Sequence, residues 1–550
     1  MIERHSVGRV LVDHFFRRFF DSDTIQIDGE MLTTVVRAVS VVTVPGLMVA
    51  FFLQNQYPRR PLWGAIQDQY FFVLFSFVVM GAVAIFEWEM LFPDRLDFLI
   101  LSPLSVKPLH MLAAKIAALI GFLSLFLVSS NFFGTVILPA ISKGHFYRQV
   151  YAHGIAVLLA GLFASLFFLA LGGVLLCVLG AAQFRAISPL IQMFSVTALA
   201  LLLLHYAKFG DSMQALLSEP LGMTRWVPPF WFLGLYEQLL RGDAAPAFAK
   251  EMAHYAIRGT LIVAAVVLLT YPTAWARMRR MAIEGSSQRR QQQPQWLGGL
   301  VHRLLRRPGE RAVFHFIGQT ITRNNRYQVY LAIYSGTGLA LATACAVTLQ
   351  TSGQNVRPAL SDEGLHAMMP LLLFWVIAGL RTAFAFPLNL SSGWIFRITG
   401  VSVSECAAAA RRWVLLCAIS VMCGILVALG LAGWDLRHLL VQAVWGLCLA
   451  TLLTDGFFLF QRSVPFNQPR MPGRTSLPLM LTLYLGVFPA FILGVIYMER
   501  EMEKDLLKLL LLGTGVTMIH AGVSLLQRGP VEVEEEMEGY EGEFQLLGLS

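Results

Sequence analysis

Apolar runs long enough to cross a membrane recur along the chain, and short polar segments separate them. A hydrocarbon core of about 30 Å needs about 20 apolar residues in a helix. Open strands cannot satisfy their backbone hydrogen bonds in lipid, so these runs are expected to be helices. The pattern predicts an all-α polytopic membrane protein with about twelve transmembrane helices, near residues 33–53, 70–88, 109–139, 149–180, 186–207, 256–276, 328–350, 366–388, 405–432, 437–461, 477–498 and 507–527.

Two of the polar breaks between these runs share one pattern. Residues 101–106 have the sequence Leu-Ser-Pro-Leu-Ser-Val, and residues 398–403, 297 positions later, have the sequence Ile-Thr-Gly-Val-Ser-Val. A cation follows each break within the next apolar run, Lys115 in the first case and Arg412 in the second. The duplication predicts two pseudo-symmetric six-helix halves in one chain, each exposing the same kind of surface to a partner.

Polar segments divide the chain into five regions. Residues 1–30 include an amphipathic pattern typical of a helix in the membrane interface, and a second such segment covers residues 297–307. Residues 278–326 form a basic linker, with about eleven Arg and two Glu between 277 and 326, and residues 529–550 form an acidic tail. The expected halves are residues 31–277, with external helices dipping into the outer leaflet near 209–255, and residues 327–528.

Charge supplies the orientation. With both termini on one side, that side collects about 27 Lys and Arg residues and the other side about 12. Both termini and both breaks are therefore expected to be cytoplasmic, in a cell membrane such as a bacterial inner membrane. Topology and attraction to anionic lipid account for the net charge of +8, so no nucleic-acid partner is expected.

Motifs for covalent chemistry are missing from the sequence. The chain contains no phosphate-binding loop, dinucleotide fingerprint, HExxH or GxSxG motif, and the six cysteines lie in apolar runs without metal-ligand spacing. We therefore expect no catalytic residue, metal or cofactor in this chain. If ATP drives the protein, another chain must bind it.

The first break carries the most distinctive pattern. Charged and apolar residues alternate after Pro93, which predicts a short amphipathic helix from Asp94 to Pro103 that is too charged to insert into lipid. Such a helix can dock in a groove of a cytoplasmic partner. The surrounding features are the acidic end of the second run, the cation after the break and an external Pro-Pro-Phe-Trp-Phe segment, represented by Glu87, Glu89, Lys115, Pro229 and Trp231.

With these features the chain resembles the ABC-type 2 export permeases, also called type V ABC exporters. The resemblance covers the first half well and the second half more weakly. It implies that the break is a coupling helix that contacts the ATPase subunit, with ATP and Mg²⁺ bound by that partner, of which two copies are expected. The implied contact residues are Asp94, Arg95, Asp97, Leu99 and Pro103 in the first half and, by the internal alignment over 392–403, Arg397 and Gly400 in the second.

The sequence also departs from the family. Many members have six spans and dimerise, whereas this chain carries both halves, so a monomer could form the full transmembrane domain. The second break has Gly400 where the first has Pro103, and it lacks the acidic cluster. The loop expected at 499–506 is shorter than its first-half counterpart. The two halves are therefore expected to differ in coupling.

Ionisable residues inside apolar runs are costly and indicate function or internal pairing. Asp455 is the main candidate, either paired with a basic group such as Arg381 or involved with substrate or ions. Arg37 lies close enough to its helix end to extend to the interface, and His520 is expected to be a satisfied interior histidine.

Two other classes remain open beside the exporter permease. A secondary carrier of the major-facilitator kind also has six plus six spans and a basic central loop, but the residues flanking Asp94-Arg95 do not match its motif. A membrane enzyme or scaffold is the third class. No residue selects a substrate, and the sequence does not fix the direction of transport.

Overall fold

A computed structural model confirms the all-α, polytopic prediction. It describes residues 7–20, 31–57, 59–88, 97, 101, 103, 106–179, 181–211, 213–217, 222–284, 305, 307–352, 355–385, 399, 401–459, 465–466 and 486–526. Within these residues, ten helices are long and apolar enough to cross a membrane. The chain is therefore a multi-pass membrane protein.

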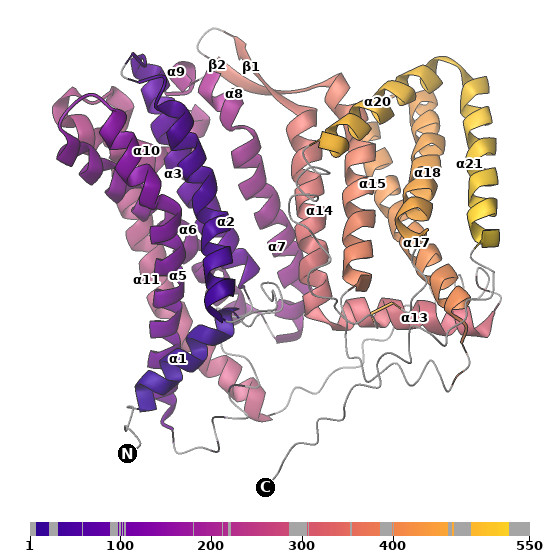
Figure 1. Cartoon of the computed structure of the whole chain (residues 1–550), viewed down its shortest axis with the longest axis horizontal. Helices are drawn as coiled ribbons and strands as arrows, with labels where there is room; N and C mark the ends of the chain where they lie inside the picture. The colour runs from indigo at the N-terminus through magenta and orange to yellow at the C-terminus, as the bar shows by residue number, and fades with distance from the viewer. Residues whose placement is uncertain are drawn as a thin grey trace. The chain divides into compact units, whose positions relative to one another are not determined.

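The chain forms two compact units (Figure 1). The first, unit 1, comprises Met1–Arg289 and Val347–Leu360, and the second, unit 2, comprises Arg290–Ala346 and Ser361–Ser550. The division falls inside the basic linker between the sixth and seventh expected spans. Each unit is described by itself below.

Unit 1 is built around helix α3, which packs against α5, α6, α7 and α10. A buried polar junction fixes three of these helices, because Ser76 donates to the Val157 carbonyl at 2.7 Å and Asn131 donates to the Ser76 hydroxyl at 2.9 Å. Unit 1 contains α1 (Val7–Phe20), α2 (Met31–Leu53), α3 (Leu62–Phe86), α5 (Pro108–Ile141), α6 (Phe146–Val178), α7 (Ala181–Leu204), α8 (Tyr206–Asp211), α9 (Met213–Leu217), η1 (Gly222–Trp226), α10 (Pro228–Arg241), η2 (Gly242–Ala244) and α11 (Ala247–Glu284).

Unit 2 is built around α15 in the same way, since α15 packs against α14, α17, α18 and α20. Figure 1 shows α13 lying across the ends of the upright helices, with α20 crosswise at their other ends. The helices of unit 2 are α13 (Pro308–Arg323), α14 (Asn325–Ala346), α15 (Asp362–Ala385), α17 (Val403–Leu431), α18 (Leu436–Phe458), α20 (Phe488–Lys504) and α21 (Leu506–Leu526).

The end of the seventh expected span was predicted wrongly. Helix α14 ends at Ala346, and residues expected to be helical up to 350 belong to strand β1 (Val347–Ser352), which pairs antiparallel with β2 (Asn355–Leu360). The sequence begins with alternating apolar and polar residues, Val-Thr-Leu-Gln, and contains the β-branched Val347, Thr348 and Thr351, which favours a strand over a helix. This hairpin groups with unit 1, where Lys208 donates to the Val347 carbonyl at 3.3 Å.

The loop expected at 499–506 is even shorter than predicted, because α20 continues through Lys504 and α21 begins at Leu506. Strong helix formers and an ion pair of 2.6 Å between Lys504 and Glu501, three residues apart, favour continuation of the helix. Asp505 then ends it and accepts from the backbone N–H of Leu507 at 3.0 Å. At 17 residues, the described α20 is shorter than the ten candidate spans.

Candidate functional site

Helix α1 is anchored to the rest of unit 1 by its aromatic face. Phe15, Phe19 and Phe20 are buried, and Phe19 stacks on Phe122 of α5 with ring centroids 4.7 Å apart. The opposite face is solvated, where Arg17 and Asp13 form an exposed ion pair at 2.9 Å. The amphipathic pattern thus holds α1 against α5, the helix that follows the first break.

Lys115, the cation after the first break, is inserted into this contact. Its side chain is buried, and its ammonium nitrogen lies 4.6 Å from the ring centroid of Phe19 and 5.2 Å from that of Phe15. A cation over an aromatic face is attracted by the ring quadrupole, and the attraction grows when water is excluded. Lys115 therefore ties α5 to α1.

A second link joins α1 to the break itself. Arg18 forms an ion pair with Asp97, whose side chain is buried. Asp97 thus faces the protein and anchors α1, whereas Pro103 is exposed and accessible to a partner. Glu87 is buried at the end of α3. The other expected residues of this segment, Glu89, Asp94, Arg95 and Leu99, lie outside the described residues.

Unit 2 repeats the arrangement with different chemistry. Arg412, 297 positions after Lys115, forms an ion pair with Glu310 of α13, and the apolar face of α13 buries Val313 and Ile317. The described helix begins at Pro308, after the amphipathic segment expected at 297–307. Arg397 and Gly400 lie outside the described residues. In both units, then, the cation after the break contacts the helix that precedes the first long apolar helix, which is α1 in unit 1 and α13 in unit 2.

The start of α17 shows how the second break ends. The Ser402 hydroxyl accepts from the backbone N–H of Glu405 at 3.3 Å, and the Glu405 carboxylate accepts from the backbone N–H of Ser402 at 3.3 Å. This reciprocal capping box satisfies two backbone donors that a helix start leaves open. The cap therefore fixes the residue at which the second break ends and α17 begins.

Asp455 is buried and paired, although not with Arg381. Its Oδ1 atom lies 3.2 Å from the Nη1 atom of Arg411, and its Oδ2 atom lies 2.8 Å from the Nδ1 atom of His520. Arg411 also donates to Ser524 at 3.0 Å, so the cluster joins α17, α18 and α21. Arg381 instead donates to the Phe457 carbonyl at 3.1 Å. Arg37 is in α2, and its side chain lies outside the described positions.

The structure also draws attention to a second sequence repeat. Pro229-Phe-Trp-Phe-Leu-Gly234 begins α10, and Pro489-Ala-Phe-Ile-Leu-Gly494 begins α20, 260 positions later. Pro229 is buried, and Trp231 donates from its indole nitrogen to the Arg225 carbonyl at 2.8 Å. The Pro and Leu-Gly positions that the two segments share are the sequence feature from which this repeat could have been predicted. Within the described residues, a helix of 14 residues (α10) precedes the last long helix of unit 1, and a helix of 17 residues (α20) precedes that of unit 2.

A buried glutamate follows this repeat in each unit. Glu237 is fully buried and pairs with Arg241 at 2.6 Å, one turn later in α10. Glu499 is 1% exposed and contacts His366 of α15 and Gln442 of α18. Burial raises the pKa of both carboxyl groups, which lie on helices outside the candidate spans. Neither glutamate was predicted, because each stands near a polar helix end and its burial comes from tertiary packing.

Comparison with known proteins adds no relative. Neither protein-family models, nor curated proteins, nor solved structures match this chain. Among the described residues, no group of three or more His, Cys, Asp or Glu side chains could hold a metal ion. The candidate site is therefore defined by its own geometry, namely the two breaks, the cations that follow them and helices α1 and α13.

The buried pairing of Asp455 predicts that its replacement will lower the stability of unit 2. Replacing Asp455 with Ala leaves the Arg411 charge buried without its carboxylate, which should destabilise unit 2 by about 3–5 kcal/mol. The double variant Asp455→Ala/Arg411→Ala should lose much less than the sum of the single variants. Thermal unfolding of the detergent-solubilised chain measures both effects. Asp435, which is exposed and whose side chain makes no capping hydrogen bond, supplies the control Asp435→Ala, which should change little. Additive losses would contradict the pairing.

The two repeated glycines make a contrasting pair. A Cβ added to Gly234 would lie 2.2 Å from the Met252 Cβ and 3.0 Å from the Ala249 carbonyl oxygen, whereas at Gly494 nothing lies within 4 Å among the described residues. Gly234→Ala should therefore force α10 away from α11 and cost about 1–3 kcal/mol. Gly494→Ala should be neutral or slightly stabilising. Equal melting temperatures for the two variants would refute the close packing.

Proposed function

We propose that this chain is the transmembrane permease subunit of an ATP-driven exporter of the ABC type. The observation that carries the proposal is the repeated contact between an interfacial helix and the helix that follows a break, made by Lys115 in unit 1 and by Arg412 in unit 2. A duplicated mechanical link of this kind suits a pair of ATPase subunits that push on both halves.

In this proposal both termini, both breaks and the interfacial helices are cytoplasmic. The short helices α10 and α20 then lie toward the external side, because each precedes the last long helix of its unit. The chain catalyses no covalent step. Two separate partner subunits bind ATP and Mg²⁺, and their closure moves the breaks.

Motion of the first break is transmitted through α1. The ion pair between Arg18 and Asp97 couples the break to α1, and Lys115 couples α1 to α5. In unit 2, Arg412 couples α13 to α17, and the neighbouring Arg411 connects α17 to Asp455 on α18. The expected result is alternating access, with the halves rocking about a central path. The unequal links imply unequal contributions of the two halves.

A second function has its own supporting observation. Two carboxylate–histidine pairs, His520 with Asp455 and His366 with Glu499, contain groups that can exchange protons in a membrane protein. A secondary carrier driven by an ion gradient would use such pairs. This alternative predicts transport without a partner ATPase.

Purification separates the two functions. The full chain, tagged and solubilised from its own membrane, should retain a protein that hydrolyses ATP, and transport in reconstituted vesicles should require ATP. Transport driven by a proton gradient alone, without ATP and without a co-purified ATPase, would overturn the exporter and favour the carrier.

The link between α1 and the break can be tested by charge exchange. Asp97→Lys should repel Arg18 and reduce transport per ATP hydrolysed by at least about tenfold, because breaking a buried ion pair costs about 3–5 kcal/mol. The double variant Arg18→Asp/Asp97→Lys should recover part of this loss. The readout is the ratio of transport to partner ATPase activity.

The exposed pair on α1 provides the matched control. The exchange Asp13→Lys/Arg17→Asp alters charges that are 56% and 60% exposed, so it should change the ratio less than about twofold. If Asp97→Lys behaves like this control, the break is not coupled through α1.

A further inference from the structure

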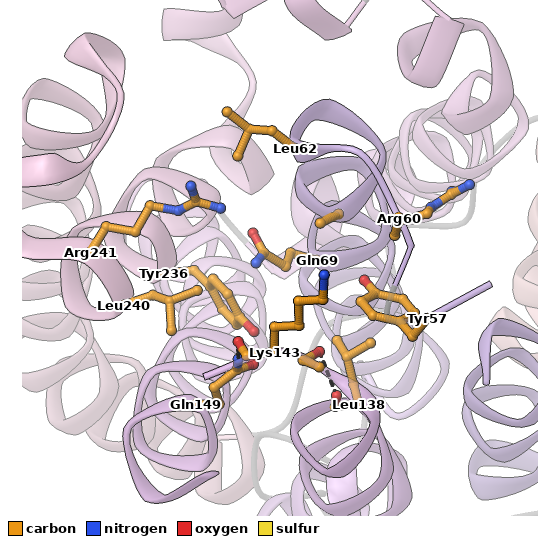
Figure 2. Close-up of a pocket in the computed structure, with 12 residues that line it drawn as sticks. Tyr57, Arg60, Leu62, Gln69, Leu138, Lys143, Gln149, Tyr236, Leu240 and Arg241 are labelled. Atoms are coloured by element: carbon orange, nitrogen blue, oxygen red, sulfur yellow. Dashed lines mark hydrogen bonds between the residues drawn. The ribbon is translucent and has the colours of Figure 1, made fainter. Parts of the chain in front are cut away.

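A small polar cavity lies in unit 1, at the end of the helices opposite α1. Its volume is about 160 Å³, and it is bordered by the α2–α3 loop, the α5–α6 turn and helices α3 and α10. Figure 2 shows Lys143 in the centre of this group, with Tyr57 on one side and Tyr236 and Gln149 on the other. The polar lining residues are Tyr57, Arg60, Gln69, Ser142, Lys143, Gln149, Tyr236 and Arg241.

The charged residues of the cavity wall are all basic. Arg60 donates from Nε and Nη2 to the two carboxylate oxygens of Asp68, at 2.9 Å and 2.8 Å. Arg241 forms an ion pair with Glu237. Each guanidinium keeps further N–H donors beyond those contacts, since arginine has five. Lys143 is exposed, and its ammonium group has no hydrogen bond or ion pair within the described part of the chain. One positive charge at the cavity therefore lacks a counter-charge.

Two buried polar atoms in the same wall also lack partners among the described residues. Tyr236 is fully buried and its hydroxyl has no hydrogen bond, and Gln69 is 6% exposed with an unpaired amide oxygen. A buried polar group left unpaired costs about 1–3 kcal/mol, so such groups ordinarily have a ligand or water as partner. The phenol and Lys143 can both donate to an anion, and the Gln69 amide oxygen can accept from a protonated one.

We propose that this cavity binds a phosphate group. Donors line it from two sides, namely Lys143 in the turn and Tyr236 and Arg241 on α10, and Arg60 of the α2–α3 loop adds a positive charge at its edge (Figure 2). This arrangement suits a tetrahedral oxyanion better than a planar carboxylate, and arginine and lysine both recognise phosphate. The cavity is close in volume to one that holds a benzene molecule, so it accommodates a headgroup but not a lipid chain.

The phosphate could be that of a lipid headgroup or a free phosphate. Both sources share the chemistry that the site recognises. The inference does not depend on the proposed export function, because binding can be measured on the solubilised chain without an ATPase.

The primary experiment is equilibrium binding of radiolabelled inorganic phosphate to the full chain in detergent, at constant ionic strength. Tyr236→Phe removes only the hydroxyl and should weaken binding about tenfold or more, since a hydrogen bond to a charged group contributes about that factor. Lys143→Ala should do the same, while Lys143→Arg should retain most of the affinity. Lys250→Ala alters an exposed lysine on α11 and serves as the control.

A second arm distinguishes the source. If inorganic phosphate does not bind saturably, native mass spectrometry should show a phospholipid retained by the wild type and by Lys250→Ala but lost from Tyr236→Phe and Lys143→Ala. Either pattern supports the site, with free phosphate or lipid as its ligand. Equal phosphate binding and equal retained lipid in the wild type, Tyr236→Phe and Lys143→Ala, with unchanged melting temperatures, would overturn the proposal.

Discussion

A cation placed after each polar break holds a short helix, α1 or α13, against the helix that begins after the break. In unit 1 the contact is a buried lysine over two phenylalanine rings, and in unit 2 it is an ion pair between arginine and glutamate. Both contacts satisfy the same physical requirement. A charged side chain beside the hydrocarbon core must have a partner or extend to water. The position of α1 and α13, and hence the surface next to each break, depends on that partner.

The same constraint explains the buried polar clusters farther along the helices. Asp455 would be costly alone, and it joins three helices because each contributes a partner. Glu499 likewise ties α20 to α15 and α18. Pairing within unit 2 accounts for the presence of these clusters, and proton exchange by their histidines is the feature that would serve the alternative carrier. The clusters also give unit 2 a continuous set of polar contacts from α13 through α17 to α21.

Much of the fold follows from hydrophobic periodicity, since long apolar runs in lipid have to be helices. The break repeat could also be found, because two short sequences keep the same spacing to a cation. The partner of Asp455 could not, since a choice between Arg381 and Arg411 depends on how three helices pack. The hairpin after Ala346 and the extension of α20 to Lys504 depended on short-range preferences that a search for long apolar runs overlooks. The glutamates at 237 and 499 were missed because their burial comes from tertiary packing.

In the proposed exporter, the exposed part of the first break contacts an ATPase subunit. A photocrosslinking amino acid at Pro103, which is exposed, should join the chain in its native membrane to a cytoplasmic protein that binds ATP, with a yield that changes when nucleotide is added. The same group at Trp226, which is 84% exposed near the start of α10, should give no such product. Absence of an ATP-binding partner at Pro103, with normal expression and transport, would contradict the account.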